Sequence, residues 1–401
     1  MANNNLTIDT ITRESLRVLH QKLNFVTNIV TEYDDTYAQS GAKVGNTARI
    51  RLPIQYATGT GPTMATGTGA DTLENQVTLT LNTQRHVPMR FTSNEMTMKI
   101  DEFSKRHVEP AMSKLAAMIE SDVLGYCVPR ASNVSYGTKV DQAAIMTGRG
   151  KLQDALAPMN DRFAILDTQA NIDLVTDNKS LFQAQDEIRK QYKEGHMGRH
   201  GGFNFFENTM LPSHTSGAEG GGVVYDVDTL QSGSYTSPNS MNLKVKTGTK
   251  TILAGDTLTI AGVYDVHPET KATRAALKTF TIITGGTGTG TLVVSPALIA
   301  TGPHQNASAA AADGALITVG GAASTAYNSS ILFQKGFAAF ASADLELPKG
   351  TAGAARASFD GISLRMVQDY SIVKDQFLTR LDVLYGKEVL RPQLGHRCLH
   401  T

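Results

Sequence analysis

Hydrophobic and polar residues alternate along the stretch from Ala48 to Phe91, with a gap in the middle. Residues 48–53 and 77–81 each alternate between apolar and polar side chains, and residues 86–91 continue the second run. Strict alternation predicts strands with one buried face and one exposed face. The connecting residues 58–71 are nearly all Gly, Thr and Ala, which offer almost nothing to a core. We expect one long hairpin, and because a two-stranded ribbon is marginal in water, its apolar face lies on its own domain or on a neighbouring subunit.

Helical spacing of apolar residues occurs on both sides of this hairpin. It predicts an amphipathic helix over residues 10–26, followed by a polar connection over residues 31–46. After the hairpin, residues 92–95 have the form of a capping box, and a helix over residues 101–126 would be roughly 40 Å long. Pro110 lies inside that helix and either kinks it or marks its first turn. The apolar face of the long helix includes Val108, Met112, Leu115 and Ile119.

From about residue 142 the pattern changes to mixed helix and strand. Helices are predicted over residues 142–156, 168–175 and 180–193, a buried strand over 162–166, a flexible loop over 195–202, and a short strand over 203–206.

The composition changes again between residues 221 and 330. This stretch contains six acidic and six basic residues, whereas charged residues make up 18% of the whole chain. Short apolar runs separated by turn signals predict a small barrel or sandwich. The six runs are residues 223–225, 243–245, 258–260, 280–283, 292–294 and 316–319.

Two long alternating strands, over residues 361–367 and 379–385, follow this block. They need a sheet to join, and we assign them to the earlier mixed domain. The charge-poor block is therefore expected to be inserted into a parent domain.

The amino-acid composition and the balance of charges exclude several classes of protein. Lys and Arg together number 37, as do Asp and Glu, so no global basic field favours nucleic-acid binding. No stretch approaches 18 consecutive apolar residues, and the N-terminus lacks the features of a signal peptide. Only Cys127, expected in a core, and Cys398 are present, which excludes a disulfide scaffold and indicates a reducing compartment. With 401 residues, the chain is long enough for more than one core.

No catalytic, cofactor or metal site is predicted. Glu194, His196 and His200 are close in sequence, but the glycines among residues 195–202 break the helix that would bring them together. The glycine-rich residues 285–290 lack the Lys and helix of a phosphate-binding loop, and no nucleophile elbow is present. The sequence predicts a protein that is not an enzyme, which disfavours a hydrolase with a β accessory domain.

The order of these elements resembles a tailed-phage major capsid protein of the Hong Kong 97-type fold, and more narrowly the coat-protein family of the short-tailed phage P22, which carries an insertion domain. The matching segments are residues 91–95, 100–111, 255–264 with Pro268 and Lys271, 380–386 and 392–395. The resemblance implies an α+β capsid fold. Its parts would be an N-terminal arm (1–44), an extended loop hairpin (45–92), a peripheral domain with a spine helix (93–139 and 350–401), an axial α/β domain (140–222 and 331–349) and an inserted all-β barrel (223–330).

The resemblance also implies a function: a structural coat protein that self-assembles, as hexamers and pentamers, into an icosahedral head enclosing double-stranded DNA. The implied partners are further copies of the chain, a scaffolding protein and a portal, with weak non-specific DNA contact and no membrane. The chain would be assembled in the host cytoplasm and end in the virion; a phage tail or fibre protein is the alternative. Implied intersubunit residues of the hairpin are Arg49, Arg51, Met64, Asp71 and Glu74. Candidate intercapsomer residues in the insertion are Lys244, Lys246, Lys250, Asp265, Glu269, Lys271 and Arg274.

Overall fold

The chain folds into two compact units, each containing one main sheet. The first unit comprises Met1–Arg49, Thr78–Leu124 and Ala338–Glu388, and the second comprises Ile50–Val77, Gly125–Phe337 and Val389–Thr401. The computed structural model describes residues 8–34, 47–56, 75–92, 104–177, 199–218, 225–234, 239–248, 251–374 and 376–401.

A six-stranded sheet forms the centre of the first unit. Its strands follow the order β1-β19-β22-β21-β20, and β4 also pairs with β22. These strands are β1 (Val30–Asp34), β4 (Thr83–Thr92), β19 (Ala338–Ala343), β20 (Gly353–Phe359), β21 (Ile362–Ser371) and β22 (Gln376–Val389).

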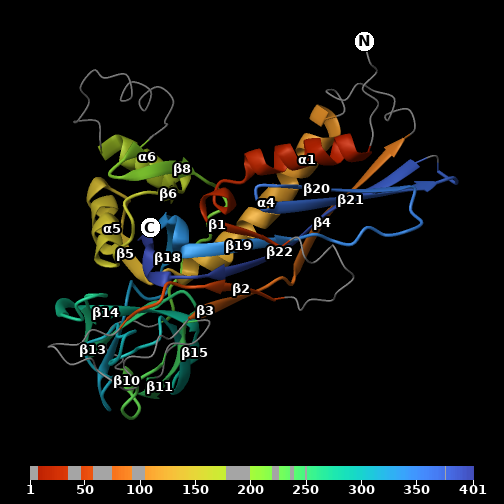
Figure 1. Ribbon diagram of the computed structural model, residues 1–401. Coiled ribbons are helices and arrows are strands. Elements are labelled where there is room, and N and C mark those ends of the chain that lie inside the picture. Colours follow the sequence, from red (N-terminus) through yellow and green to blue (C-terminus); the bar gives the residue numbers. More distant parts are fainter. Residues whose placement is uncertain are drawn as a thin grey trace, which may run out of the picture. The chain divides into compact units, whose positions relative to one another are not determined.

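Two helices cover one face of this sheet (Figure 1). Helix α1 (Ile8–Lys22) buries Ile11, Leu16 and Leu19, and the Thr12 hydroxyl lies 3.5 Å from Sδ of Met366 in β21. Helix α4 (Glu109–Cys127) follows a π-helical turn, Ser104–Val108. Pro110 therefore occupies the first turn of α4, a part of a helix that favours proline.

The two closing strands join a different sheet from the predicted one. Residues 361–367 and 379–385 fall within β21 and β22, which pair with each other, with β4 and with β20 rather than with the mixed domain. The prediction was wrong because β1 and β4 were not recognised as members of a sheet. Strand β1 lies in the stretch read as a polar connection, yet it pairs in parallel with the buried, alanine-rich β19.

The hairpin is shorter than predicted on its return side. Strands β2 (Thr47–Arg51) and β3 (Gln76–Thr80) form their own two-stranded sheet. Val77 and Leu79 are buried while their neighbours along β3 are not, which confirms the alternation. Residues 86–91, however, do not extend this ribbon, because strand pairing breaks at Leu81 and Asn82 and the chain continues as β4 against β22.

The second unit contains a seven-stranded mixed sheet in the order β5-β23-β18-β6-β8-β7, with β9 paired to β18. Its elements are β5 (Asn133–Gly137), α5 (Gln142–Asp154), β6 (Arg162–Leu166), α6 (Thr168–Asp177), β7 (Arg199–His200), β8 (Phe203–Glu207), β9 (His214–Thr215), β18 (Ala326–Gln334) and β23 (Gly395–His400). Helices α5 and α6, strand β6 and strand β8 confirm the predicted elements. Strand β7 lies where a loop was expected, and the predicted helix over residues 180–193 falls outside the described residues.

A closed six-stranded barrel is inserted into this sheet. Its strands are β10 (Tyr225–Val227), β11 (Met241–Thr247), β13 (Thr257–Val266), β14 (Thr273–Thr284), β16 (Gly290–Ser295) and β17 (Leu316–Val319), in the order β10-β11-β16-β14-β13-β17. A small pair, β12 (Thr251–Ile252) and β15 (Gly286–Thr287), accompanies them. The chain leaves the sheet after β9 and returns in β18, and Thr215 pairs with Ala326. The barrel is therefore built from the segment between two paired strands of one sheet.

The barrel has its own apolar core. Inward-facing side chains include the fully buried Phe280, and Tyr225, Leu258 and Ile282 are each 1% exposed. Because alternate residues of each strand point inward, the turn-separated apolar runs of the sequence become this core.

Candidate assembly surfaces

The four predicted residues of the long helix are core residues of the first unit. Val108 is 1% exposed, and Met112, Leu115 and Ile119 are fully buried. Their spacing of three or four residues places them on one face of the helix. They position the helix within the subunit and are not themselves a contact surface.

A cluster of charged and polar side chains connects helix α4 to the sheet of the same unit. Tyr385 of β22 donates a hydrogen bond from its hydroxyl to Asp122 of α4 at 2.7 Å, and Lys387 forms an ion pair with the same carboxylate. Burial alone would raise the pKa of Asp122, but the hydrogen bonds from Lys387 and Tyr385 hold it below its ordinary value. Sequence reasoning missed this cluster, because its members are more than 260 residues apart.

The described part of the ribbon exposes its basic residues. Arg49 and Arg51 lie two residues apart on β2, hence on the same side of the strand, and both are exposed. The backbone N–H of Leu52 donates to the carbonyl of Asn75 at 2.8 Å, which continues the pairing beyond β2. The remaining candidates of the hairpin, Met64, Asp71 and Glu74, lie outside the described residues.

The intercapsomer candidates do not form one cluster. Lys244 and Lys246 are exposed on β11, where they alternate with the buried Leu243 and Val245. Lys246 forms a 2.7 Å ion pair with Asp313. Glu269 is exposed, and Lys250 is not among the described residues.

Two other candidates are already paired inside the chain. Asp265 lies 2.7 Å from Nζ of Lys278, and Arg274 lies 3.5 Å from Asp265 and 3.1 Å from Asp154 of α5. Arg274 therefore connects the barrel to helix α5 of the mixed sheet. This internal contact makes it a weaker candidate for bonding another subunit than its sequence position indicated.

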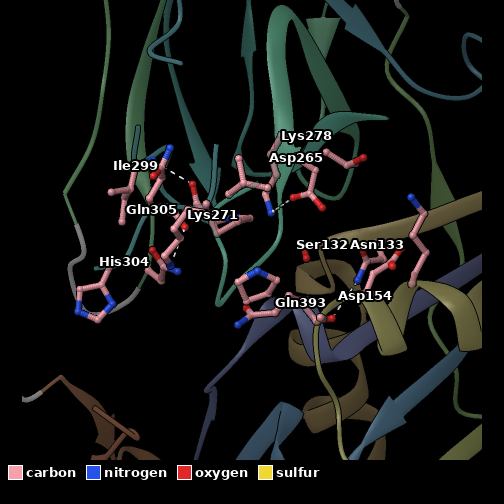
Figure 2. A pocket seen from close by; sticks show the side chains of 18 of the residues that line it. Ser132, Asn133, Asp154, Asp265, Lys271, Lys278, Ile299, His304, Gln305 and Gln393 are labelled. Carbon is pink, nitrogen blue, oxygen red and sulfur yellow. Dashed lines mark hydrogen bonds and ion pairs between the residues drawn. The ribbon is translucent and has the colours of Figure 1, made fainter. Parts of the chain in front are cut away.

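A polar cavity of about 140 Å³ lies beside this contact (Figure 2). Lys271 has a left-handed backbone, with φ of 57°, and donates from Nζ to the carbonyl of Gln305 at 3.2 Å. Burial lowers the pKa of Lys271, and burial followed by the nearby Lys271 lowers the pKa of His304. Asn75, which follows the ribbon connection, lies 2.7 Å from Nε2 of His304. The cavity thus adjoins the barrel, helix α5 and the base of the ribbon, with a lining of amides and paired charges.

A buried polar node joins the barrel to the mixed sheet. The Asp256 carboxylate, which is fully buried, accepts hydrogen bonds from the backbone of Leu253 at 2.8 Å and of Gly217 at 3.1 Å. Its other oxygen lies 2.9 Å from Nε2 of His214 in β9. These contacts fix the turn between β12 and β13 to the part of the chain that leaves the mixed sheet after β9.

The C-terminal strand contributes to the same node. Arg397 of β23 is 1% exposed and donates from Nη2 to the carbonyl of Gly255 at 2.8 Å. Burial lowers the pKa of Arg397 to about 10. Tyr136 of β5 lies 2.9 Å from the hydroxyl of Thr257. Sequence reasoning missed the node, since only the Gly255-Asp256 turn gave a local signal.

Among the described residues, we find no arrangement of side chains typical of a catalytic or metal-binding site. Among the residues placed by the structure, no group of three or more His, Cys, Asp or Glu side chains is arranged to hold a metal ion. His200 lies 3.0 Å from the Gln142 side chain, whereas Glu194 and His196 are outside the described residues. Within the same ranges, none of the helices has the length and apolar character that crossing a membrane requires.

Comparison with known proteins matches residues 1–398 to the family described as "P22 coat protein - gene protein 5". Among solved structures, the chain is similar to that of Mycobacterium phage Che8, with 10% identity, coverage of 94% of this chain and 90% of that chain, and a TM-score of 0.45. It is similar to the capsid of the cyanophage P-SCSP1u, with 11% identity, 94% and 88% coverage and a TM-score of 0.47. The CUS-3 coat protein I-domain is 24% identical over 24% of this chain and 94% of that chain, with a TM-score of 0.20. None of the curated proteins matches the chain.

Proposed function

The chain belongs to the P22 coat protein family, and from this premise we propose how its parts build the shell of a phage head. As a family member it is a structural coat protein of the capsid, so the alternative of a tail or fibre protein is set aside. The shell is built from hexamers and pentamers of this chain and encloses double-stranded DNA. It assembles in the host cytoplasm with a scaffolding protein and a portal.

The proposed parts are those of the capsid fold. Residues 1–44 are the N-terminal arm, 45–92 the extended loop, 93–139 with 350–401 the peripheral domain, 140–222 with 331–349 the axial domain, and 223–330 the insertion domain. The closed barrel between β9 and β18 supports the last assignment. The fully buried apolar face of α4 supports its role as the spine helix of the peripheral domain.

The ribbon supports the proposal that much of the stability of the chain comes from contacts with other subunits in the assembled shell. Its strands β2 and β3 pair only with each other among the described strands, and residues 58–71 between them are almost devoid of core-forming side chains. The paired strands already bury Val77 and Leu79 within the chain, so the part left for an outside surface is the connection between them. We assign that surface to an adjacent subunit, with Arg49, Arg51, Met64, Asp71 and Glu74 at the contact.

Deletion of residues 60–69 tests this proposal. The variant should remain a soluble, folded subunit but should no longer form closed shells in negative-stain microscopy, when expressed alone or with its neighbouring genes. A matched control replaces residues 60–69 by a Gly/Ser sequence of equal length, which separates the reach of the ribbon from its side-chain contacts. Normal shells from the deletion variant would show that the ribbon does not bridge subunits.

A further inference from the structure

The polar cavity beside helix α5 is lined by more cationic than anionic side chains (Figure 2). The barrel contributes Lys271, Lys278 and Asp265 to this lining, and α5 contributes Lys151 and Asp154. The volume of about 140 Å³ is enough for one small ion with a few waters, because roughly 10–15 Å³ of such space holds one water.

Both carboxylates of the lining are neutralised within the chain. Asp265 lies 2.7 Å from Nζ of Lys278 and 3.5 Å from Arg274. Arg274 also lies 3.1 Å from Asp154. These four groups balance one another, two positive and two negative. The other two lysines of the lining therefore carry the remaining charge of the cavity.

Neither of these two lysines, Lys151 and Lys271, forms an ion pair with a described residue. Nζ of Lys271 donates to the carbonyl of Gln305 at 3.2 Å, and Glu269 is near enough to act on its pKa without pairing with it. Burial lowers the pKa of Lys271, and burial followed by Lys271 lowers the pKa of His304, another residue of the lining. A negative ion in the cavity would relieve both effects.

The backbone of Lys271 indicates a role for its side chain. Its φ of 57° lies in the left-handed region, which Gly and Asn adopt more easily than Lys does. The turn that imposes this conformation is closed by the N–H of Lys271, which donates to the carbonyl of His267 at 2.9 Å. Gly or Asn would suit this turn better, so the advantage of Lys lies in its ammonium group at the cavity.

We propose that the cavity binds a small oxyanion, inorganic phosphate or an ion of similar shape and charge, between Lys271 of the barrel and Lys151 of α5. Lysine binds phosphate as a point charge. A tetrahedral oxyanion presents acceptors in several directions, which suits two donors from different elements. A cavity of about 140 Å³ admits such an ion but not a DNA duplex. The bound ion links the barrel to α5 within one subunit, so this proposal does not depend on shell formation.

Titration calorimetry with inorganic phosphate tests the site in full-length, unassembled subunits at constant ionic strength. We expect a dissociation constant of about 1 mM or lower. Lys271→Asn and Lys151→Gln should each weaken binding about tenfold or more, the loss expected for one charge-assisted hydrogen bond. Lys271→Asn should also be at least as stable as the parent protein to urea, because Asn tolerates the left-handed backbone. Lys244→Gln, at an exposed position of β11 outside the cavity, should bind phosphate like the parent.

The imidazole resonances of His304 locate the bound ion. Phosphate should raise the pKa of His304 in the parent protein, because a nearby negative charge favours the imidazolium, whereas chloride at the same ionic strength should not. Failure to bind phosphate below about 100 mM would reject the site, as would equal binding by the parent and both lysine variants. An equal effect of chloride on His304 would show general screening only. A DNA duplex that displaces phosphate in a Lys271-dependent manner would assign these lysines to nucleic acid instead.

Discussion

Protonation of one buried histidine should make the stability of this protein depend on pH. His396 of β23 is fully buried, and its Nε2 lies 3.1 Å from the hydroxyl of Ser135. Burial, followed by the charges of Lys151 and Arg397, lowers the pKa of His396 from 6.5 to about 3. The folded protein therefore holds this side chain neutral at pH values at which the unfolded chain binds a proton.

The sign and size of the effect follow from linkage. Between pH 6.5 and pH 3 the unfolded state binds more protons at His396 than the folded state does, so stability falls as pH falls through this window. At about pH 5 the loss is about 2 kcal/mol, from 1.5 pH units at about 1.36 kcal/mol each. Well above pH 6.5 the histidine is neutral in both states and contributes no pH dependence.

Urea unfolding at about pH 7.5 and about pH 5 measures this loss. Far-ultraviolet circular dichroism is the suitable signal, because the chain contains no Trp. We expect His396→Gln to lose about 2 kcal/mol less than the parent protein on acidification, because Gln cannot be protonated. His86→Gln, at an exposed position, should keep the parental pH dependence. Equal losses in His396→Gln and the parent protein would refute the reasoning, as would an imidazolium signal from native His396 at about pH 5.

Two further predictions concern the barrel and the genome. An isolated fragment of residues 221–330 should unfold cooperatively and give dispersed amide resonances, because the barrel buries its own core around Phe280; a collapsed, undispersed spectrum would contradict this. Unassembled subunits should bind duplex DNA weakly with a shallow salt dependence, because the barrel contains six acidic and six basic residues and the whole chain 37 of each. Tight binding at about 150 mM salt, with a slope implying six or more phosphate contacts, would contradict it.

Local patterns predicted the barrel far better than the sheets. Each barrel strand is a short apolar run between turns, so it can be recognised without knowing its partner. Sheet membership depends instead on pairing between distant segments. Strand β1 reads as polar by itself, and only its pairing with β19, some 300 residues away, makes it a strand of the sheet.

The site residues show the same difference: those that depend on local spacing were predicted, and those that depend on remote partners were not. Val108 and Ile119 were predicted from helical spacing and are buried, because spacing within one helix is a local property. The buried Asp256 and Arg397 could not be predicted, since charged residues are ordinarily exposed and the groups that satisfy them come from remote strands. The pairing of Arg274 with Asp154 is likewise invisible in a sequence read position by position.

The point where the barrel joins the mixed sheet has a consequence for engineering. Thr215 and Ala326 are antiparallel partners, so the two ends of the inserted segment are as close as the ends of a tight hairpin, about 5 Å apart. The entropic cost of holding these ends together rises only slowly with the length of the inserted segment. The position can therefore accept a foreign domain whose termini are adjacent, for display on the particle. Replacing the barrel would remove the partners of Arg397, His214 and Tyr136, which are the Gly255 carbonyl, the Asp256 carboxylate and the Thr257 hydroxyl. These groups then need substitute partners or apolar replacements.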